Sequence, residues 1–374
     1  MSGIYIHIPF CKTRCIYCDF FSTTQLEQRE LYVDAICKEI GMTDKYLDGD
    51  TIHSIYFGGG TPSQLDTKQI GRIFDTIQAH HPIAPDCEIT IELNPDDVTK
   101  AYADRLRQLP VNRVSLGIQS FHDDILRFIH RRHTSQQAID AVRLLQENGF
   151  RNISIDLMFG FPDETLEDWQ YDIEQALQMN VQHISAYSLM YEEGTKLYNL
   201  LTLHQIQEID EELSRTMYQT LMERLKDAGF DHYEISNFAI PNYYSRHNSS
   251  YWNNTHYLGL GAGAHSYNGT SRQSNVCNLK KYIDGIQHGE PCVDNETLTK
   301  DQQYNETVMT RLRTCKGLNT DDIKTNFGYD YYLHLMTAAT PYLNIGLLKN
   351  TQGNLSLTPK GIFISNDIIS SLFV

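Results

Sequence analysis

The sequence predicts an α/β protein in which an incomplete (β/α)6 barrel precedes a smaller α+β domain with a winged-helix-like end. Short apolar, β-branched runs recur six times along the first half of the chain, and helical patterns separate them. The chain has 374 residues, more than the roughly 250–300 that a single core usually organises. A second, smaller domain is therefore expected.

Six strands are expected, at residues 4–9, 54–57, 88–93, 113–118, 152–158 and 183–189. Since helical segments separate them, they should pair in parallel through right-handed crossovers. One intervening helix is expected to carry on one face Leu31, Ala35, Ile36 and Ile40. Another carries Ala138, Ala141, Leu144 and Leu145 and stops at Asn148-Gly149. A long helix over residues 203–228 is expected to close the barrel.

These patterns divide the chain into a barrel domain at residues 1–230, a connecting region at 231–300 and a winged-helix-like domain at 301–374. The connecting region is dense in Tyr, Asn, His and Gly. In the last domain a β-hairpin is expected around Gly353-Asn354, which separates two short apolar runs.

Composition narrows the classes of function. The chain carries 47 Asp and Glu against 31 Lys and Arg, for a formal net charge of −16. Such a surface repels nucleic-acid backbones and anionic lipid, so neither is an expected partner. An apolar run of the roughly 18 residues that a membrane-spanning helix needs is absent. The first ten residues do not read as a secretory signal, so we expect a cytoplasmic protein.

The spacing Cys11-x3-Cys15-x2-Cys18 places three thiolates on one short loop directly after the first strand. Cubane iron–sulfur clusters usually take four cysteines, so three leave one iron open to an outside ligand. The alternative is a zinc site, but zinc prefers four closed ligands, often in paired C-x2-C hooks. We therefore expect a [4Fe–4S] cluster, and core packing for the scattered cysteines.

Two segments carry a resemblance to a known family. Ile6-His7-Ile8-Pro9-Phe10-Cys11 and Cys15-Ile16-Tyr17-Cys18-Asp19-Phe20 resemble the radical S-adenosylmethionine (SAM) group of oxygen-independent coproporphyrinogen III oxidases and their relatives. The resemblance runs from residue 4 to the end of the chain. It implies a radical SAM barrel whose open iron binds SAM, with catalytic residues left unassigned.

The resemblance also implies a SAM pocket. Gly58-Gly59-Gly60-Thr61-Pro62 follows the second strand, and backbone without side chains allows a ligand to approach closely, although a plain tight turn is the alternative. The positions that match SAM contacts of the oxidases are Tyr5, Gly59, Gly60, Thr61, Glu92, Gln119, Arg131 and Asp156. Arg131 suits the methionyl carboxylate, and its alternative is a solvated helix end.

A second motif, His247-Asn248-Ser249-Ser250-Tyr251-Trp252, resembles the H-N-x-x-Y-W signature of the heme chaperone branch of this family. Imidazole is a common heme ligand, and Tyr251 and Trp252 offer flat apolar faces. The alternative is a loop in which His247 satisfies buried polar groups. His265 ends a glycine-rich run that is expected to pack closely, and it is a second heme-facing candidate.

Three readings of function remain: a heme chaperone that passes heme to an acceptor protein, an oxygen-independent coproporphyrinogen III oxidase, and a radical SAM enzyme with another substrate. The cysteine pattern of the oxidases resembles Cys-x3-Cys-x2-Cys-x-Cys. This chain has Phe20 at the position of the fourth cysteine. The oxidases also carry an extension before the cluster loop, and here Cys11 lies almost at the start. The chaperone reading is therefore favoured. Whether SAM is cleaved, whether heme is covalent, and whether the protein is a monomer or a homodimer stay open.

Overall fold

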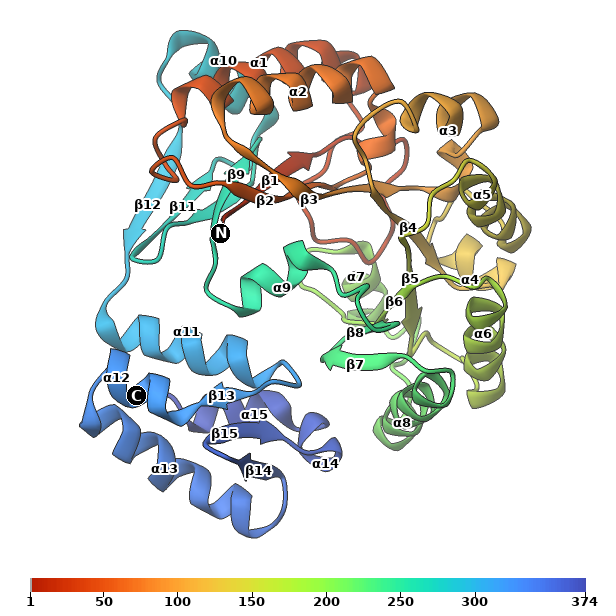
Figure 1. Cartoon of the computed structure of the whole chain (residues 1–374). Helices are drawn as coiled ribbons and strands as arrows, with labels where there is room; N and C mark the ends of the chain where they lie inside the picture. The colour runs from red at the N-terminus through yellow and green to blue at the C-terminus, as the bar shows by residue number, and fades with distance from the viewer. Residues whose placement is uncertain (1) are drawn as a thin grey trace.

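A computed structural model describes residues 2–374, and six parallel strands in chain order form the middle of a 12-stranded sheet. They are β1 (Ser2–Ile8), β2 (Ile52–Gly59), β3 (Ile83–Leu93), β4 (Arg113–Gln119), β5 (Ile153–Phe159) and β6 (His183–Ser188). The sheet curves into an open barrel with helices outside it (Figure 1). The six predicted strands and their parallel order are confirmed.

An outer layer of helices covers the convex face of these strands (Figure 1). It comprises α1 (Arg29–Met42), α2 (Thr67–His80), α3 (Lys100–Leu106), α4 (Asp123–Phe128), α5 (Ser135–Glu147) and α6 (Leu166–Gln178). Capping boxes start α2, α5 and α6, at Asp66, Thr134 and Thr165 respectively. On α1, Ala35, Ile36 and Ile40 are buried, whereas Leu31, which was expected on the same face, is 46% exposed.

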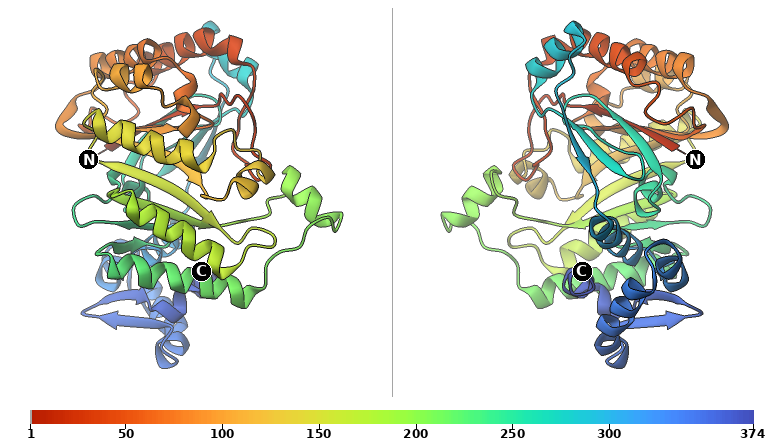
Figure 2. Two further views of the ribbon diagram at one scale, coloured as in Figure 1. Left: turned by 90° about the vertical axis from the view of Figure 1, so that its right-hand side faces the viewer. Right: turned by 90° about the vertical axis from the view of Figure 1, so that its left-hand side faces the viewer.

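The predicted helix over 203–228 is also wrong in its first third. The structure has α7 (Lys196–Thr202) and then α8 (Glu211–Asp227), with non-helical chain between them. His204 takes a left-handed φ of 55° after α7. Asp210 then starts a new helix, because its carboxylate accepts the free backbone N–H groups of Glu212 and Leu213. The α7 segment projects from the body of the protein (Figure 2).

The segment 231–300 extends the sheet at both edges. At one edge β7 (Asp231–Glu234) and β8 (Asn237–Ala239) continue antiparallel from β6. At the other edge β9 (His256–Leu260) pairs in parallel with β1. Three antiparallel strands follow it: β10 (His265–Tyr267), β11 (Ser271–Asn275) and β12 (Val293–Thr297). The apolar core of the barrel continues into α10 (Leu279–His288).

A buried carboxylate fastens this extension to the barrel. Glu39 on α1 accepts hydrogen bonds from Gly261 N at 2.8 Å, Asn275 Nδ2 at 2.6 Å and the Tyr282 hydroxyl at 2.6 Å. The glycine-rich run before His265 packs closely, as expected: a Cβ on Gly259 would lie 2.0 Å from the His265 carbonyl oxygen. That approach leaves room only for glycine.

Residues 300–374 contain a second apolar core, separate from that of the barrel. This segment contains α11 (Lys300–Leu312), β13 (Leu318–Asn319), α12 (Thr320–Asn326), α13 (Tyr329–Asn344), β14 (Leu348–Thr351), β15 (Asn354–Leu357), α14 (Pro359–Ile362) and α15 (Ser365–Ser371). The predicted hairpin is β14–β15, and Gln352 and Gly353 both have positive φ, as a tight two-residue turn requires.

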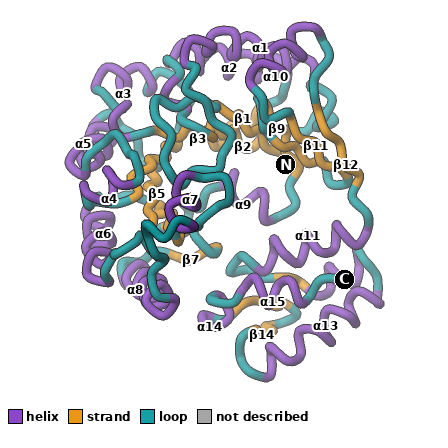
Figure 3. The backbone as a smooth tube through the Cα atoms, turned by 180° about the vertical axis from the view of Figure 1, so that it is seen from behind, coloured by secondary structure: helices purple, strands orange, loops and turns teal. Residues whose placement is uncertain are grey.

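Viewed from behind, this domain lies below the barrel and next to α8 and α9 (Arg246–Trp252) (Figure 3). Its first helix contacts the end of α9 through Arg311 Nη1, which donates to Asn253 Oδ1 at 2.7 Å. Within residues 2–374, no helix combines the length and apolar character that crossing a membrane requires.

Candidate functional site

A pocket of about 490 Å³ opens at the carboxyl ends of the parallel strands. Parallel α/β folds place their sites at this end. Ten predicted residues line it: Cys11, Cys15, Cys18, Gly59, Gly60, Thr61, Glu92, Gln119, Arg131 and Asp156. Tyr5 does not line it, and its hydroxyl lies 3.1 Å from His7 Nδ1. The structure therefore brings together the cysteines and all but one of the predicted SAM contacts.

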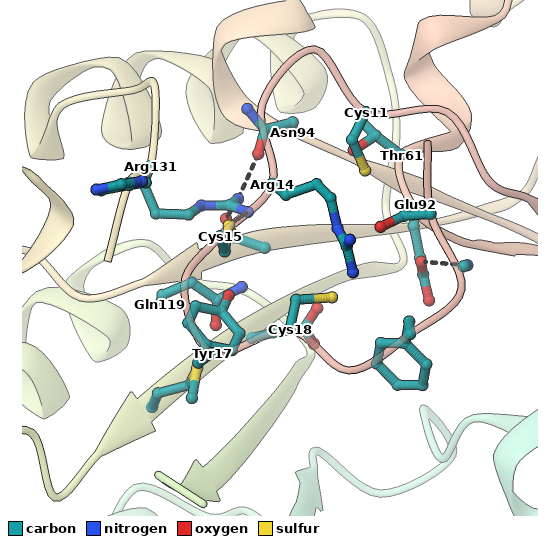
Figure 4. Close-up of a pocket in the computed structure, with 18 of the residues that line it drawn as sticks. Cys11, Arg14, Cys15, Tyr17, Cys18, Thr61, Glu92, Asn94, Gln119 and Arg131 are labelled. Carbon is teal, nitrogen blue, oxygen red and sulfur yellow. Dashed lines mark hydrogen bonds between the residues drawn. The ribbon is translucent and has the colours of Figure 1, made fainter. Parts of the chain in front are cut away.

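The three cysteines lie around this pocket on the loop after β1 (Figure 4). Cys11 Sγ is 3.5 Å from Thr61 Oγ1, and Arg131 Nη1 lies 3.6 Å from Cys15 Sγ. All three are free thiols, and burial raises the pKa of Cys18 to about 11. A Cβ on Gly60 would lie 2.8 Å from the Pro9 carbonyl carbon and 3.0 Å from Cys11 Sγ, so a side chain there would push the glycine run away from the cysteine loop.

This donor set fits a [4Fe–4S] cluster. One loop supplies three soft sulfur ligands, and no fourth cysteine lines the pocket among residues 2–374. In the same described range, no three His, Cys, Asp or Glu side chains converge closely enough to hold a single metal ion. A cubane is larger than one ion, so its thiolates stand around a space instead of meeting at a point.

Asp97 fastens the cysteine loop to its neighbours. Its carboxylate, with a side chain only 5% exposed, accepts from Lys12 Nζ at 2.7 Å, Ser63 Oγ at 2.8 Å and Gln64 Nε2 at 2.5 Å. One acid thereby joins the cysteine loop, the turn after the glycine run and the loop after β3. Asp97 belongs to no motif and was not predicted, although its position just past a strand end was a usable signal.

Glu92 and Asp156 bring two carboxylates to the pocket floor. Glu92 accepts from the Tyr56 hydroxyl at 2.8 Å and from Gly59 N at 3.1 Å. Burial raises the pKa of Glu92 to about 7 and also raises the pKa of Asp156. The Arg113 guanidinium opposes both shifts by its positive charge. Their oxygens suit the hydroxyl groups of a ribose.

Arg131 points into the pocket, which excludes a solvated helix end. Its Nη2 donates to Asn94 Oδ1 and to the Gly117 carbonyl oxygen. A Cβ on Gly117 would lie 2.8 Å from Gln119 Nε2 and 3.2 Å from Arg131 Nη2, so a side chain there would displace the ends of these two pocket residues. Asn94 and Gly117 were missed by the sequence analysis, because an isolated Asn or Gly carries no motif.

The H-N-x-x-Y-W segment lies elsewhere. It forms α9, and His247 is 1% exposed in the barrel interior. His247 Nδ1 lies 2.9 Å from Ser54 Oγ, and Nε2 lies 3.0 Å from the Tyr251 hydroxyl, one helical turn along. Burial lowers the pKa of His247 to about 3, so the ring is neutral. Glu88 accepts from the His247 backbone N–H at 3.1 Å and fixes the start of the helix.

Both ring nitrogens of His247 therefore have partners in this structure. Trp252 Nε1 is buried without a hydrogen-bond partner among residues 2–374. His265, the second candidate, is exposed on β10 and does not line the pocket. Contacts of His247, Tyr251 and Trp252 with heme remain a prediction.

Six parallel strands with three cysteines, a glycine loop and paired carboxylates at one end define a radical SAM protein. The model of the radical SAM superfamily matches residues 5–176, and that of the HemN C-terminal domain matches residues 298–364. Heme chaperone HemW of Bacillus subtilis is 34% identical over 374 residues, covering 99% of each chain. Heme chaperone HemW of Lactococcus lactis is 32% identical, covering 100% of this chain and 97% of the relative.

The chain belongs to the radical SAM superfamily and, within it, to the family of these chaperones. Membership of the superfamily implies a [4Fe–4S] cluster and SAM. Among solved structures, coproporphyrinogen III oxidase (HemN) from Escherichia coli is similar with a TM-score of 0.86 at 22% identity, covering 100% of this chain and 90% of that chain. This likeness confirms the predicted fold.

Proposed function

We propose that the protein is a heme chaperone that holds a [4Fe–4S] cluster and SAM, binds heme and transfers it to an acceptor protein. The observation that carries the proposal is similarity over the whole chain to proteins named heme chaperone, combined with an intact set of pocket residues. A radical SAM fold can serve a binding protein, because function depends on the residues of the site and not on the fold alone.

In this proposal Cys11, Cys15 and Cys18 hold the cluster. Gly59 and Gly60 present backbone to the methionyl end of SAM, and Arg131 pairs with its carboxylate. The remaining contacts are Thr61, Glu92, Gln119 and Asp156, of which Glu92 and Asp156 accept from the ribose. Tyr5 does not line the pocket and is not among them. A reduced cluster held there would be able to pass one electron to the sulfonium of SAM. Arg131, beside Cys15, supplies positive charge to the thiolates.

For heme, the sequence motif points to His247, Tyr251 and Trp252. Ligation of iron by His247 requires release of its bond to Tyr251 or to Ser54. A matched control tests this: His183 is likewise fully buried, with Ser154 Oγ and the Tyr233 hydroxyl each 2.7 Å from its ring nitrogens. If iron binds His247, His247→Ala loses the Soret band of bound heme while His183→Ala keeps it.

The test of the whole proposal uses anaerobically reconstituted protein. Two results are expected: a saturable SAM-dependent change in the cluster's EPR spectrum, and saturable binding of about one heme per chain in a Soret titration. An isotopic heme chase into an apo-hemoprotein then measures transfer. Heme uptake no greater than that of an unrelated acidic protein would overturn the proposal.

The alternative function is oxygen-independent coproporphyrinogen III oxidation, and its specific support is the fold shared with the oxidase. Formation of protoporphyrinogen under anaerobic reduction with SAM would establish it. Phe20 weighs against this alternative function, because it occupies the position of the fourth cysteine in the pattern expected of the oxidases.

We define the acceptor only by its chemistry: it is a protein that takes up heme. We also propose that the chain works in the cytoplasm, because its eight free cysteines suit a reducing compartment. Sedimentation velocity with and without the cluster tests whether it works as a homodimer.

A further inference from the structure

Three large, mainly apolar side chains that line the cysteine pocket are exposed to solvent. Phe20, two residues after Cys18, is 62% exposed; Tyr187 on β6 is 41% exposed; Met190, just past β6, is 64% exposed. All three also line the pocket. Single exposed apolar residues are ordinary, but a group of them at one opening marks a surface that binds something. We call Phe20, Tyr187 and Met190 the mouth shelf.

A positive charge lies beside the mouth shelf. Arg14 is exposed on the cysteine loop, lines the same pocket and reaches inward between the cysteines (Figure 4). In the part of the chain that the structure describes, its guanidinium has no hydrogen-bond or ion-pair partner. Arg132, by contrast, is paired with Asp96 at 2.8 Å. Asp19 and Glu192 also line the mouth, so the charge there is mixed.

We propose that heme lies across this mouth, with its macrocycle on the mouth shelf and a propionate paired with Arg14. The inference rests on the proposed chaperone function, and it places heme at the mouth of the pocket instead of at the H-N-x-x-Y-W motif. Aromatic rings and a thioether suit a flat apolar macrocycle. A guanidinium suits a carboxylate at its edge. The thioether of Met190 also belongs to a class of heme ligand.

The shelf is mechanically tied to the cluster loop. Leu197 N, on the projecting α7 segment, donates to the Ile16 carbonyl oxygen at 2.9 Å, and Ile16 packs with Leu189 and Leu197 in one apolar cluster. Met190 is next to Leu189 in the sequence, so order in the cysteine loop also orders this side of the mouth. Heme on the shelf would cover the way out for SAM.

The barrel interior fits heme less well than the mouth. His247 is buried with both nitrogens engaged, whereas Phe20 and Met190 present open faces. Phe20 also occupies the position at which the cysteine pattern expected of the oxidases has its fourth cysteine. A bulky apolar ring in that place enlarges the shelf on the side of the cysteine loop.

The experiment is heme titration of cluster-reconstituted protein with SAM bound. Phe20→Ala combined with Met190→Ala is expected to weaken heme binding about 10-fold or more. Leu203→Ala is the matched control, because Leu203 is 65% exposed but does not line the pocket. Met190→His is expected to shift the Soret band and the heme EPR signal to those of imidazole-ligated iron. Heme should also slow dissociation of radiolabelled SAM.

The outcomes separate the two proposals. If the wild-type protein binds no heme, the proposed function fails. If the wild type binds heme and both shelf variants keep its affinity and spectrum, the mouth location is overturned while the function stands. Loss of heme in His247→Ala with retention in the double variant also overturns it. If the double variant loses its cluster, Met190→Ala and Met190→His decide, because residue 190 lies outside the cysteine loop.

Discussion

Replacing Asp97 by alanine should weaken the loops that hold the cluster. Its carboxylate accepts from Ser63 and Gln64, whose residues are 7% and 4% exposed, so removing it leaves two buried donors unpaired. Each such donor costs about 1–3 kcal/mol. Lys12 is 47% exposed and rehydrates, so its contribution is small, about 0.5 kcal/mol. Together these give a loss of about 2.5–6.5 kcal/mol.

Anaerobic urea denaturation measures this loss in free energy of unfolding, and iron content and SAM affinity report its effect on the site. Asp96→Ala is the control, because Asp96 pairs with Arg132 and Asn94 but does not contact the cysteine loop. It should cost about 1 kcal/mol. An Asp97→Ala protein that is as stable as wild type, or more stable than Asp96→Ala, would refute the role of Asp97 as an anchor.

Three further outcomes are expected. Cys18→Ser should abolish retention of the cluster in an iron and sulfide assay, while Cys37→Ser, which lies on α1, should retain it. Gly117→Ala should weaken SAM binding about 10-fold by EPR titration, since its Cβ would lie 2.8 Å from Gln119 Nε2, whereas Gly71→Ala on α2 should leave SAM affinity unchanged. Burial raises the pKa of Glu164 from 4.5 to about 8, so the folded state keeps a proton that the unfolded state loses. The free energy of unfolding should therefore fall as the pH rises between about 4.5 and 8. In urea unfolding, Glu164→Gln should reduce this pH dependence. An unchanged pH dependence would contradict a raised pKa of Glu164.

The sequence predicts the parts of the fold that depend on local pattern. The six parallel strands have apolar runs, and Asn148-Gly149 ends α5 as expected, with Gly149 at φ 85°. The edge strands were not predicted because they lack such a pattern: β11 reads Ser-Arg-Gln-Ser-Asn and is held by its neighbours β10 and β12. The break before α8 was not predicted, because Asp210 starts the helix by capping its N-terminus and leaves no mark on the hydrophobic periodicity.

The site follows the same division. The cysteines, Gly59, Gly60 and Glu92 sit at strand ends, where topology alone brings them together. Asp97 and Gly117 act through contacts between loops, which no local pattern reveals. The place of His247 depends on Ser54 and Glu88, two residues far away in the sequence. A motif alone therefore does not tell whether its histidine faces a ligand or the barrel interior.

The interior position of His247 connects the heme motif to the SAM pocket. Its ring stacks on Tyr56 with centroids 5.0 Å apart, and Tyr56 donates to Glu92. Substitution of His247 therefore acts on SAM as well as on any heme contact. Loss of heme in a His247 variant identifies an iron ligand only if SAM binding is intact in the same protein.

Tyr251→Phe separates the two roles. It keeps the ring, which packs against His247 and Tyr257 at 5.2 and 4.8 Å between centroids, but removes the hydroxyl that occupies His247 Nε2. If His247 were the iron ligand, freeing Nε2 would strengthen heme binding and shift the Soret band. With heme at the mouth, we expect unchanged heme affinity and spectrum and a SAM affinity within about 3-fold of wild type, because one buried hydrogen bond is lost next to Tyr56. If Tyr251→Phe bound heme with higher affinity and with the spectrum of imidazole-ligated iron, His247 would be identified as the iron ligand.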